Sequence, residues 1–169
     1  MIKTWLVGLF YGLVLLTTLT PTLSAQVPSA EVAAVSAVLD GFHAAAARAD
    51  EAGYFSLLAE NAVFLGTDGT ERWDKAAFRA FSHPYFAAGK GWTYTPRDRH
   101  VNLSRDGRVA WFDEMLDNAS YGECRGSGVL EKGEDGWKIV QYNLSIPVPN
   151  DLSKDLVARI LKAKKAPKP

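Results

Sequence analysis

The sequence is poor in the residues that build disulfides and metal sites. It has one cysteine, Cys124, and three histidines, His43, His83 and His100, in 169 residues. A single cysteine excludes an intrachain disulfide, so stability must come from the hydrophobic core. The histidines are far apart, and neither a His-x-x-x-His pair nor a cysteine pair occurs, so we predict no metal and no cofactor.

The sequence also lacks an excess of charge of either sign. Lysine and arginine together number 19, as do aspartate and glutamate, which gives a net charge of zero. Without a general basic field, nucleic acid is not expected as a partner. No apolar run after residue 25 is long enough to cross a bilayer, so we expect no membrane span once the N-terminal segment is removed.

The first 25 residues have the composition of a secretory signal peptide. Lys3 is their only charge, Trp5 to Leu16 is almost wholly apolar, and Thr17 to Ala25 is small and polar. This pattern predicts cleavage after Ala25 and a secreted or periplasmic protein. A retained membrane anchor is the alternative, although an apolar core of about a dozen residues is short for a span of about 20. We therefore expect a signal peptide at 1–25.

The remaining chain is predicted to be one α+β domain at 26–150, followed by a C-terminal amphipathic helix and basic tail at 151–169. Helical periodicity indicates three N-terminal helices, near 30–49, 51–60 and from Asp74 to the His83-Pro84 pair, with a short strand at 62–65. Four long strands follow, at 92–103, 108–117, 124–132 and 137–146. Gly126 and Gly128 favour a bulge or sharp bend. Helices followed by an antiparallel meander predict a curved, cone-shaped sheet wrapped around the helices.

The strand at 108–117 carries an acid on each of two apolar faces. Successive strand side chains alternate, so Asp113 shares a face with Trp111, and Glu114 lies on the opposite face. We expect both faces to be covered, with Asp113 facing a cavity where burial raises its pKa and makes it a general base. The alternative is a salt bridge to an arginine of a neighbouring strand. Glu114, on the opposite face, is expected to be an interface or surface acid under the helix or a partner subunit.

His100 is the histidine best placed to assist Asp113. The turn at 104–107 pairs its strand with the strand of Asp113, so an Asp–His proton-transfer unit is possible. The alternative is a partly exposed histidine at a cross-strand position. His83 is expected to shape a helix end, and His43, on the first helix, is expected to have no special role.

Aromatic residues are abundant, with five tryptophans. Most of them are explained by core packing. A cavity for a flat apolar ligand is the second interpretation, with hydrogen-bonding groups on the last strand. The residues predicted to line it are Trp73, Tyr85, Trp92, Trp111, Tyr142, Asn143 and Ser145.

Several landmarks resemble the nuclear transport factor 2-like (NTF2-like) superfamily, in particular its SnoaL-like branch. They are the alanine-rich first helix, Ala62-Val63-Phe64, the Asp113-Glu114 strand, Gly136-Trp137-Lys138-Ile139 and Tyr142-Asn143-Leu144-Ser145. The resemblance covers about residues 29 to 150 and implies the cone fold. The superfamily includes ketosteroid isomerases, dehydratases, polyketide cyclases, epoxide hydrolases and non-enzymatic binding domains. The Tyr–Asp–Asp arrangement of ketosteroid isomerases is not recognisable in this sequence.

Two functions follow from these features. The first is binding of a small apolar or aromatic molecule in the cone, with acid/base turnover of the isomerase, cyclase or hydrolase type as its chemistry. The second is a non-catalytic association module whose cavity is filled by side chains. An open cavity of a few hundred Å³ favours the first. In either case we expect a homodimer formed through the sheet.

Overall fold

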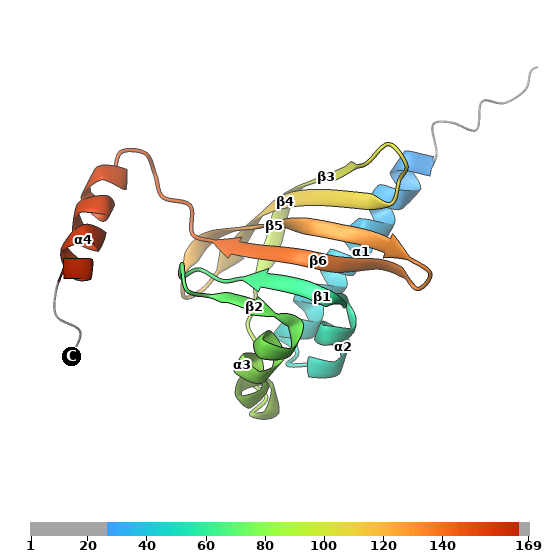
Figure 1. Cartoon of the computed structure of the whole chain (residues 1–169), viewed down its shortest axis with the longest axis horizontal. Coiled ribbons are helices and arrows are strands. Elements are labelled where there is room, and N and C mark those ends of the chain that lie inside the picture. The colour runs from blue at the N-terminus through green and yellow to red at the C-terminus, as the bar shows by residue number, and fades with distance from the viewer. Residues whose placement is uncertain (1–26, 166–169) are drawn as a thin grey trace, which may run out of the picture.

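The computed structural model describes residues 27–165, which form a single six-stranded sheet with helices on one face (Figure 1). The predicted signal peptide lies outside the described residues. In chain order the elements are α1 (Val27–Ala47), α2 (Glu51–Ser56), β1 (Leu58–Leu65), β2 (Arg72–Asp74), α3 (Lys75–Ala87), β3 (Thr95–Leu103), β4 (Val109–Asn118), β5 (Gly122–Gly133), β6 (Gly136–Ser145) and α4 (Ser153–Lys165). The strand order across the sheet is β2-β1-β6-β5-β4-β3.

The four long strands form the predicted antiparallel meander, and the two short N-terminal strands extend it. β1 pairs with β6 in parallel, and β2 pairs with β1 in antiparallel orientation, so the sheet as a whole is mixed. The parallel pair is possible because α3 and β3–β5 lie between β1 and β6 and supply the long connection that it needs. The predicted helix at 51–60 is shorter than expected, because the chain turns into β1 at Leu58.

The core lies between the helices and the concave face of the sheet. Val35, Leu39 and Phe42 of α1 are fully or almost fully buried. The stretch Ala30–Ala47 of α1 is the one helix among residues 27–165 that is long and apolar enough to cross a membrane, so the expectation that no run after residue 25 reaches this length was wrong. Its apolar side packs into the core, as expected of the central helix in a folded domain.

β4 reverses the expected assignment of its two faces. Ala110, Phe112 and Glu114 are buried on the concave face, whereas Trp111 and Asp113 are exposed on the convex face. The alternation of side chains was predicted correctly, but within residues 27–165 only the concave face of β4 is covered. The helices described here pack against one face only, and the acid that they enclose is Glu114, which is 1% exposed.

Besides a register shift of β1 against β6 between Leu58 and Val63, two irregularities occur in the sheet. In β3, two residues, Asp98 and Arg99, occupy the space opposite Glu114, between the pairs Arg97–Met115 and His100–Asp113. This bulge leaves Asp98 with a φ of 49°, in the left-handed region that aspartate tolerates better than most residues. A second register shift, between β5 and β6 at Val129 and Leu130, lies next to Gly128, as the predicted bend requires.

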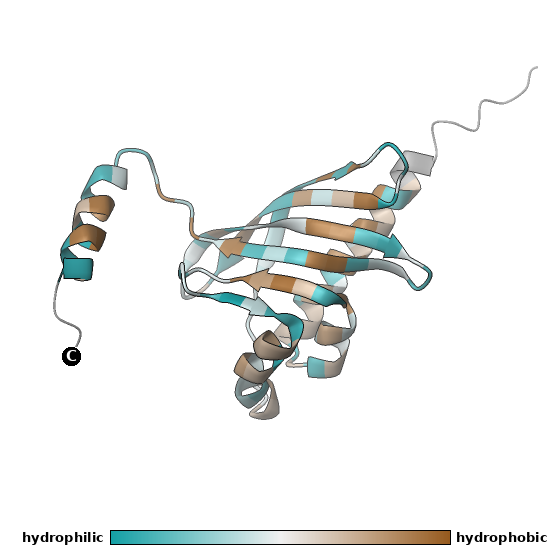
Figure 2. Cartoon of the chain, viewed as in Figure 1, coloured by the Kyte–Doolittle hydropathy of each residue, from teal (hydrophilic) through white to brown (hydrophobic). Residues whose placement is uncertain are grey.

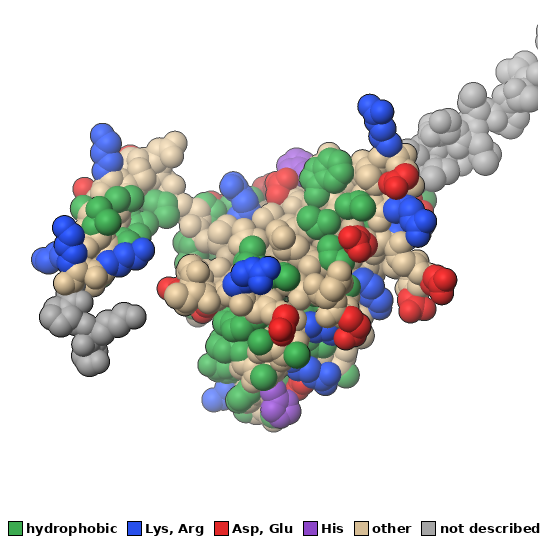
Figure 3. All heavy atoms as spheres, in the orientation of Figure 1, with side chains coloured by type: hydrophobic (Ala, Val, Ile, Leu, Met, Phe, Trp, Pro, Cys, Tyr) green, Lys and Arg blue, Asp and Glu red, His purple; other side chains and the backbone are tan. Residues whose placement is uncertain are grey.

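α3 and α4 depart from expectation in different ways. The side chain of Asp74 caps α3 by accepting a hydrogen bond from the Ala77 backbone N–H, as predicted, but the helix continues through Pro84 to Ala87. α4 forms as predicted, yet it buries no residue and stands apart from the sheet (Figures 1 and 2). Its apolar side chains are visible on its surface in Figure 3.

Candidate functional site

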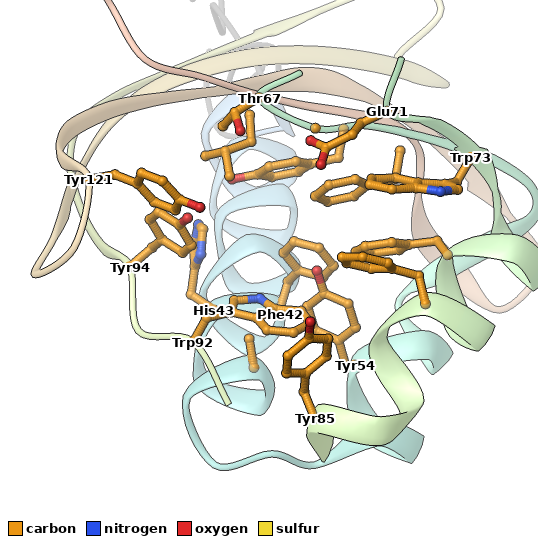
Figure 4. Close-up of a pocket in the computed structure, with 17 residues that line it drawn as sticks. Phe42, His43, Tyr54, Thr67, Glu71, Trp73, Tyr85, Trp92, Tyr94 and Tyr121 are labelled. Atoms are coloured by element: carbon orange, nitrogen blue, oxygen red, sulfur yellow. The ribbon is translucent and has the colours of Figure 1, made fainter. Parts of the chain in front are cut away.

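A cavity of about 320 Å³ opens between the helices and the concave face of the sheet (Figure 4). Its apolar walls are mostly aromatic. The lining residues are Phe42, His43, Ala46, Tyr54, Phe64, Gly66, Thr67, Glu71, Trp73, Phe78, Phe81, Tyr85, Trp92, Tyr94, Tyr121, Tyr142 and Leu144.

Stacked rings give this cavity flat walls. Phe64 stacks on Phe78 with ring centroids 3.9 Å apart, and Trp73 stacks on Phe81 at 4.8 Å. Phe64 is also nearly parallel to Tyr142, with an interplanar angle of 8°. Parallel ring faces present a surface on which another planar ring can stack. The cavity therefore fits a flat molecule better than a branched one.

His43, which lines the cavity, belongs to a network of charged side chains in which Glu114 is buried and Asp40 is exposed. His43 Nε2 lies 2.6 Å from Glu114 Oε1, and Arg99 Nε donates to Glu114 Oε2 at 2.7 Å. Arg99 Nη1 donates to Asp40 Oδ1 at 2.8 Å and to the Ser36 carbonyl at 3.0 Å. Both oxygens of the Glu114 carboxylate therefore have a partner, as a buried carboxylate requires.

The network forms because three elements present polar groups to the same place. Ser36, Asp40 and His43 follow one another on α1 at four- and three-residue steps, so they share one side of the helix. The bulge in β3 sets Arg99 opposite Glu114 of β4. Helix periodicity and the bulge together therefore bring His43 and the guanidinium of Arg99 into contact with the carboxylate of Glu114.

Glu114 is held as a carboxylate. Burial alone would raise its pKa, but the hydrogen bonds from His43 and Arg99 and the positive charge of Arg99 outweigh burial and lower the pKa below its usual value. A carboxylate that accepts from His43 Nε2 fixes the tautomer in which Nε2 carries the proton. Nδ1 is then the unprotonated nitrogen of His43 and can accept a proton.

Tyrosine hydroxyls lie on the same cavity wall. Burial raises the pKa of Tyr94 to about 12 and the pKa of Tyr142 well above its usual value. Both hydroxyls therefore stay protonated at neutral pH and can donate a hydrogen bond. A Cβ at Gly126 would stand 2.5 Å from Tyr142 Oη and 3.1 Å from Glu114 Oε1, so this part of the site needs a glycine.

The structure brings together four of the nine predicted site residues. Trp73, Tyr85, Trp92 and Tyr142 line the cavity. Five lie elsewhere: Asp113, His100, Trp111, Asn143 and Ser145 are absent from the cavity lining. Alternation explains the last two, because Tyr142 and Leu144 face the cavity and their neighbours on β6 therefore face away.

The predicted Asp113–His100 unit is not a cavity site. The two residues do pair across β3 and β4, as the turn indicated, but both are exposed on the convex face. The prediction that Asp113 faces the cavity was therefore wrong. Two residues of the site were not predicted as such: Glu114, expected to be an interface or surface acid under the helix or a partner subunit, and His43, expected to have no special role.

Cys124 lies in the interior, as expected of a small hydrophobic residue. Its side chain is fully buried, and burial raises the pKa of its thiol. A buried thiol with a raised pKa is a poor nucleophile. Among residues 27–165, no cluster of three or more His, Cys, Asp or Glu side chains is placed to hold a metal ion.

Comparisons with known proteins agree on the fold. A family model described as a SnoaL-like domain matches residues 35–149. A comparison with curated proteins gives no significant match.

Among solved structures, one similar protein comes from Streptomyces avermitilis and is named a candidate dehydratase of the NTF2-like family. It has a TM-score of 0.63 and 17% sequence identity, and the match covers 72% of this chain and 99% of that chain. An NTF2-like protein of unknown function from Pseudomonas putida has a TM-score of 0.60 and 13% identity, with 73% and 91% covered. A candidate ketosteroid isomerase from Shewanella frigidimarina has a TM-score of 0.53 and 26% identity, with 66% and 94% covered.

Proposed function

Because this chain belongs to the family of SnoaL-like domains, a fold that hosts both enzymes and binding proteins, we propose its function from its own cavity. We propose that it binds a small, flat, largely apolar molecule and that His43 takes a proton from that molecule. The observation that carries the proposal is that His43 lines an aromatic cavity and is paired with the buried carboxylate of Glu114. A purely hydrophobic binding site would not need this pair.

The chemistry that suits this wall is proton abstraction next to a carbonyl group. His43 Nδ1 takes a proton from the carbon beside the carbonyl, and the electrons of that C–H bond move into the carbonyl to give an enolate. Glu114 stabilises the imidazolium that forms. A hydroxyl of Tyr94 or Tyr142 donates a hydrogen bond to the enolate oxygen, where charge develops. Return of the proton to the same or another carbon completes an exchange or an isomerisation.

One comparison supports this choice of chemistry. The protein from Shewanella frigidimarina that is named a candidate ketosteroid isomerase shares the fold at 26% identity. The residues proposed for this chain come from its own geometry.

Binding can be measured with 2-tetralone, a flat aromatic ketone, by isothermal titration calorimetry. We expect Trp73→Ala to weaken binding by about 3- to 10-fold, because loss of a stacked aromatic contact costs about 0.5–1.5 kcal/mol. Trp111→Ala is the matched control, since Trp111 is exposed on the convex face and should leave the affinity unchanged. Equal losses in both variants, or no binding to the wild type, would contradict the proposed cavity.

Proton transfer can be measured separately in D₂O by NMR, as exchange of the hydrogens beside the carbonyl of 2-tetralone. We expect wild-type protein to accelerate this exchange about 10²- to 10⁴-fold over buffer, the usual range for a positioned acid or base. His43→Gln should return the rate to that of buffer while keeping the ketone bound, and His100→Gln should have no effect. If the wild type binds 2-tetralone but does not accelerate exchange of its hydrogens, the protein is a binding protein and the enzymatic part of the proposal is contradicted.

A second role, association of two copies through the sheet, is favoured by one observation. Trp111 is 47% exposed on the convex face, which no helix of residues 27–165 covers. A large aromatic side chain near the centre of a protein interface contributes strongly to binding. We therefore propose a homodimer through this face, and sedimentation equilibrium of wild type against Trp111→Glu measures it. The rival association module with a filled cavity is disfavoured, because the cavity is open.

We also propose that the protein is exported. The support is the apolar N-terminal segment, which is compatible with a signal peptide. N-terminal sequencing of the exported protein should then begin at Gln26. A first residue of Met1 in the exported protein would mean that the segment is retained.

A further inference from the structure

α4 is an amphipathic helix without a partner in the structure. Leu152, which precedes it, and Leu156, Val157, Ile160 and Leu161 within it are all exposed large apolar side chains. Leu152, Leu156 and Ile160 follow one another at four-residue steps, as do Val157 and Leu161, so these side chains lie along one side of the helix, which spans about 20 Å. An exposed apolar stripe of this kind marks a surface made for docking.

The mouth of the cavity is an apolar surface at the same end of the molecule. It is formed by the loop between β1 and β2, the turn between β4 and β5, and one side of α3. Phe81 and Tyr85 of α3 and Tyr121 of the β4–β5 turn line the cavity and are exposed. Figure 1 shows α4 beside the end of the sheet where β6 stops and the β1–β2 loop turns back. From these two surfaces we infer that α4 docks over the mouth and covers the cavity of its own chain.

Charge complementarity identifies the body of the same chain as the partner of α4. Residues 27–152 contain 12 basic and 18 acidic residues, a net charge of −6, whereas residues 153–169 contain six basic residues and one acidic residue, a net charge of +5. Two of the acids, Asp68 and Glu71, lie in the β1–β2 loop at the mouth. Opposite charges therefore steer the helix toward this part of the surface.

The connection to α4 limits how far the helix can lie from the end of β6. Seven residues, 146–152, separate β6 from α4, and an extended chain of seven residues spans roughly 23–25 Å. Lys164 already approaches the mouth: the pKa of Asp68 is lowered by hydrogen bonds from Thr70 and, in smaller part, by the positive charge of Lys164. By helical spacing, Lys164 lies on the same side of α4 as Val157 and Ile160.

Hydrogen exchange followed by mass spectrometry tests the docking in the full chain without any ligand. We expect the amides of α4 to exchange at least about tenfold more slowly than those of an unstructured peptide, because docked helices open rarely. Leu156→Asp should abolish this protection and speed exchange in the β1–β2 loop. Ala158→Asp places the same residue on the opposite side of α4 and is the matched control for helix propensity and charge. It should leave the amides of α4 and of the β1–β2 loop as protected as in the wild type.

Three results would overturn the inference. The first is equal loss of protection in Leu156→Asp and Ala158→Asp. The second is protection that rises with protein concentration, which would mean that α4 docks on a second copy. The third is protection that appears only with vesicles containing anionic phosphatidylglycerol, which would mean a membrane surface. Since no ligand is added, the outcome is independent of whether the cavity binds 2-tetralone.

Discussion

Glu114→Ala is expected to lower the free energy of unfolding by about 3–5 kcal/mol, the usual cost of removing one member of a buried ion pair. Glu114 is almost fully buried, and its carboxylate accepts hydrogen bonds from His43 and Arg99. Without it, the guanidinium of Arg99 would lose one of its two carboxylate partners, and Arg99 Nη2 already has no hydrogen-bond partner among the described residues. The loss can be measured by urea denaturation monitored by circular dichroism.

Asp113→Ala is the matched control, because it removes the preceding carboxylate from the same strand. Asp113 is exposed on the convex face, so we expect a change within about 0.5 kcal/mol. The pair of variants thus compares two adjacent acids that differ mainly in the face that they occupy. A larger loss for Asp113→Ala than for Glu114→Ala would mean that the two faces are assigned the wrong way round.

The pH dependence of stability gives a second readout of Glu114. Its pKa is lower in the folded protein than its ordinary value of 4.5, so its contribution to stability is fully present above about pH 4.5. That contribution is lost as the pH falls through the lowered pKa of the folded state. Glu114→Gln should therefore be less stable than wild type at pH 7, and the difference should shrink as the pH is lowered toward 3. A difference that does not change with pH would contradict the charged state of Glu114.

The elements of the fold were predicted correctly because each strand and helix is signalled by the local periodicity of its residues. The four long strands, their turns and the amphipathic C-terminal helix were each signalled by residues within ten positions of one another. The parallel pairing of β1 with β6 had no such signal, since it joins Phe64 to Tyr142 across most of the domain. Pairings between distant segments are fixed by tertiary packing, which a single sequence does not record.

The sequence of β4 alone does not indicate which of its two acids is enclosed. Both faces of β4 carry large apolar residues, so neither is evidently the inner one. The next strand carries the missing signal: Asp113 pairs with Ser127, between the outward residues Arg125 and Val129, whereas Glu114 pairs with Gly126. A comparison of cross-strand neighbours would have identified Glu114 as the enclosed acid.

His43 could not be found from sequence spacing. Its partner Glu114 is 71 residues away, and contact depends on how α1 crosses the sheet. The contact of Arg99 with Glu114 depends in addition on the bulge at Asp98, which shifts the alternation of side chains along β3 by one residue. By contrast, Trp73, Tyr85, Trp92 and Tyr142 were predicted to line the cavity because large aromatic residues in an α+β cone face its interior more often than not.

Gly128→Ala is expected to lower the free energy of unfolding by about 1–3 kcal/mol, the typical cost of forcing an extra methyl group into a packed region. A Cβ at this position would overlap the backbone oxygen of Gln141 and stand 3.0 Å from Phe112 Cε1. Relief would require movement of the β6 backbone, since a main-chain oxygen cannot rotate away as a flexible side chain can. Thermal and urea unfolding both measure the loss.

Gly133→Ala separates this steric effect from the general effect of replacing a glycine in β5. No atom lies within 4 Å of a Cβ built at Gly133, so we expect unchanged or slightly increased stability, by up to about 1 kcal/mol from the reduced entropy of the unfolded chain. Gly128 pairs with Tyr142 beside the register shift between β5 and β6, where the sheet bends around the cavity. Gly128→Ala should therefore also weaken 2-tetralone binding, and Gly133→Ala should not. Equal stability of the two variants would mean that the bend does not depend on the close approach of β5 to β6 at Gly128.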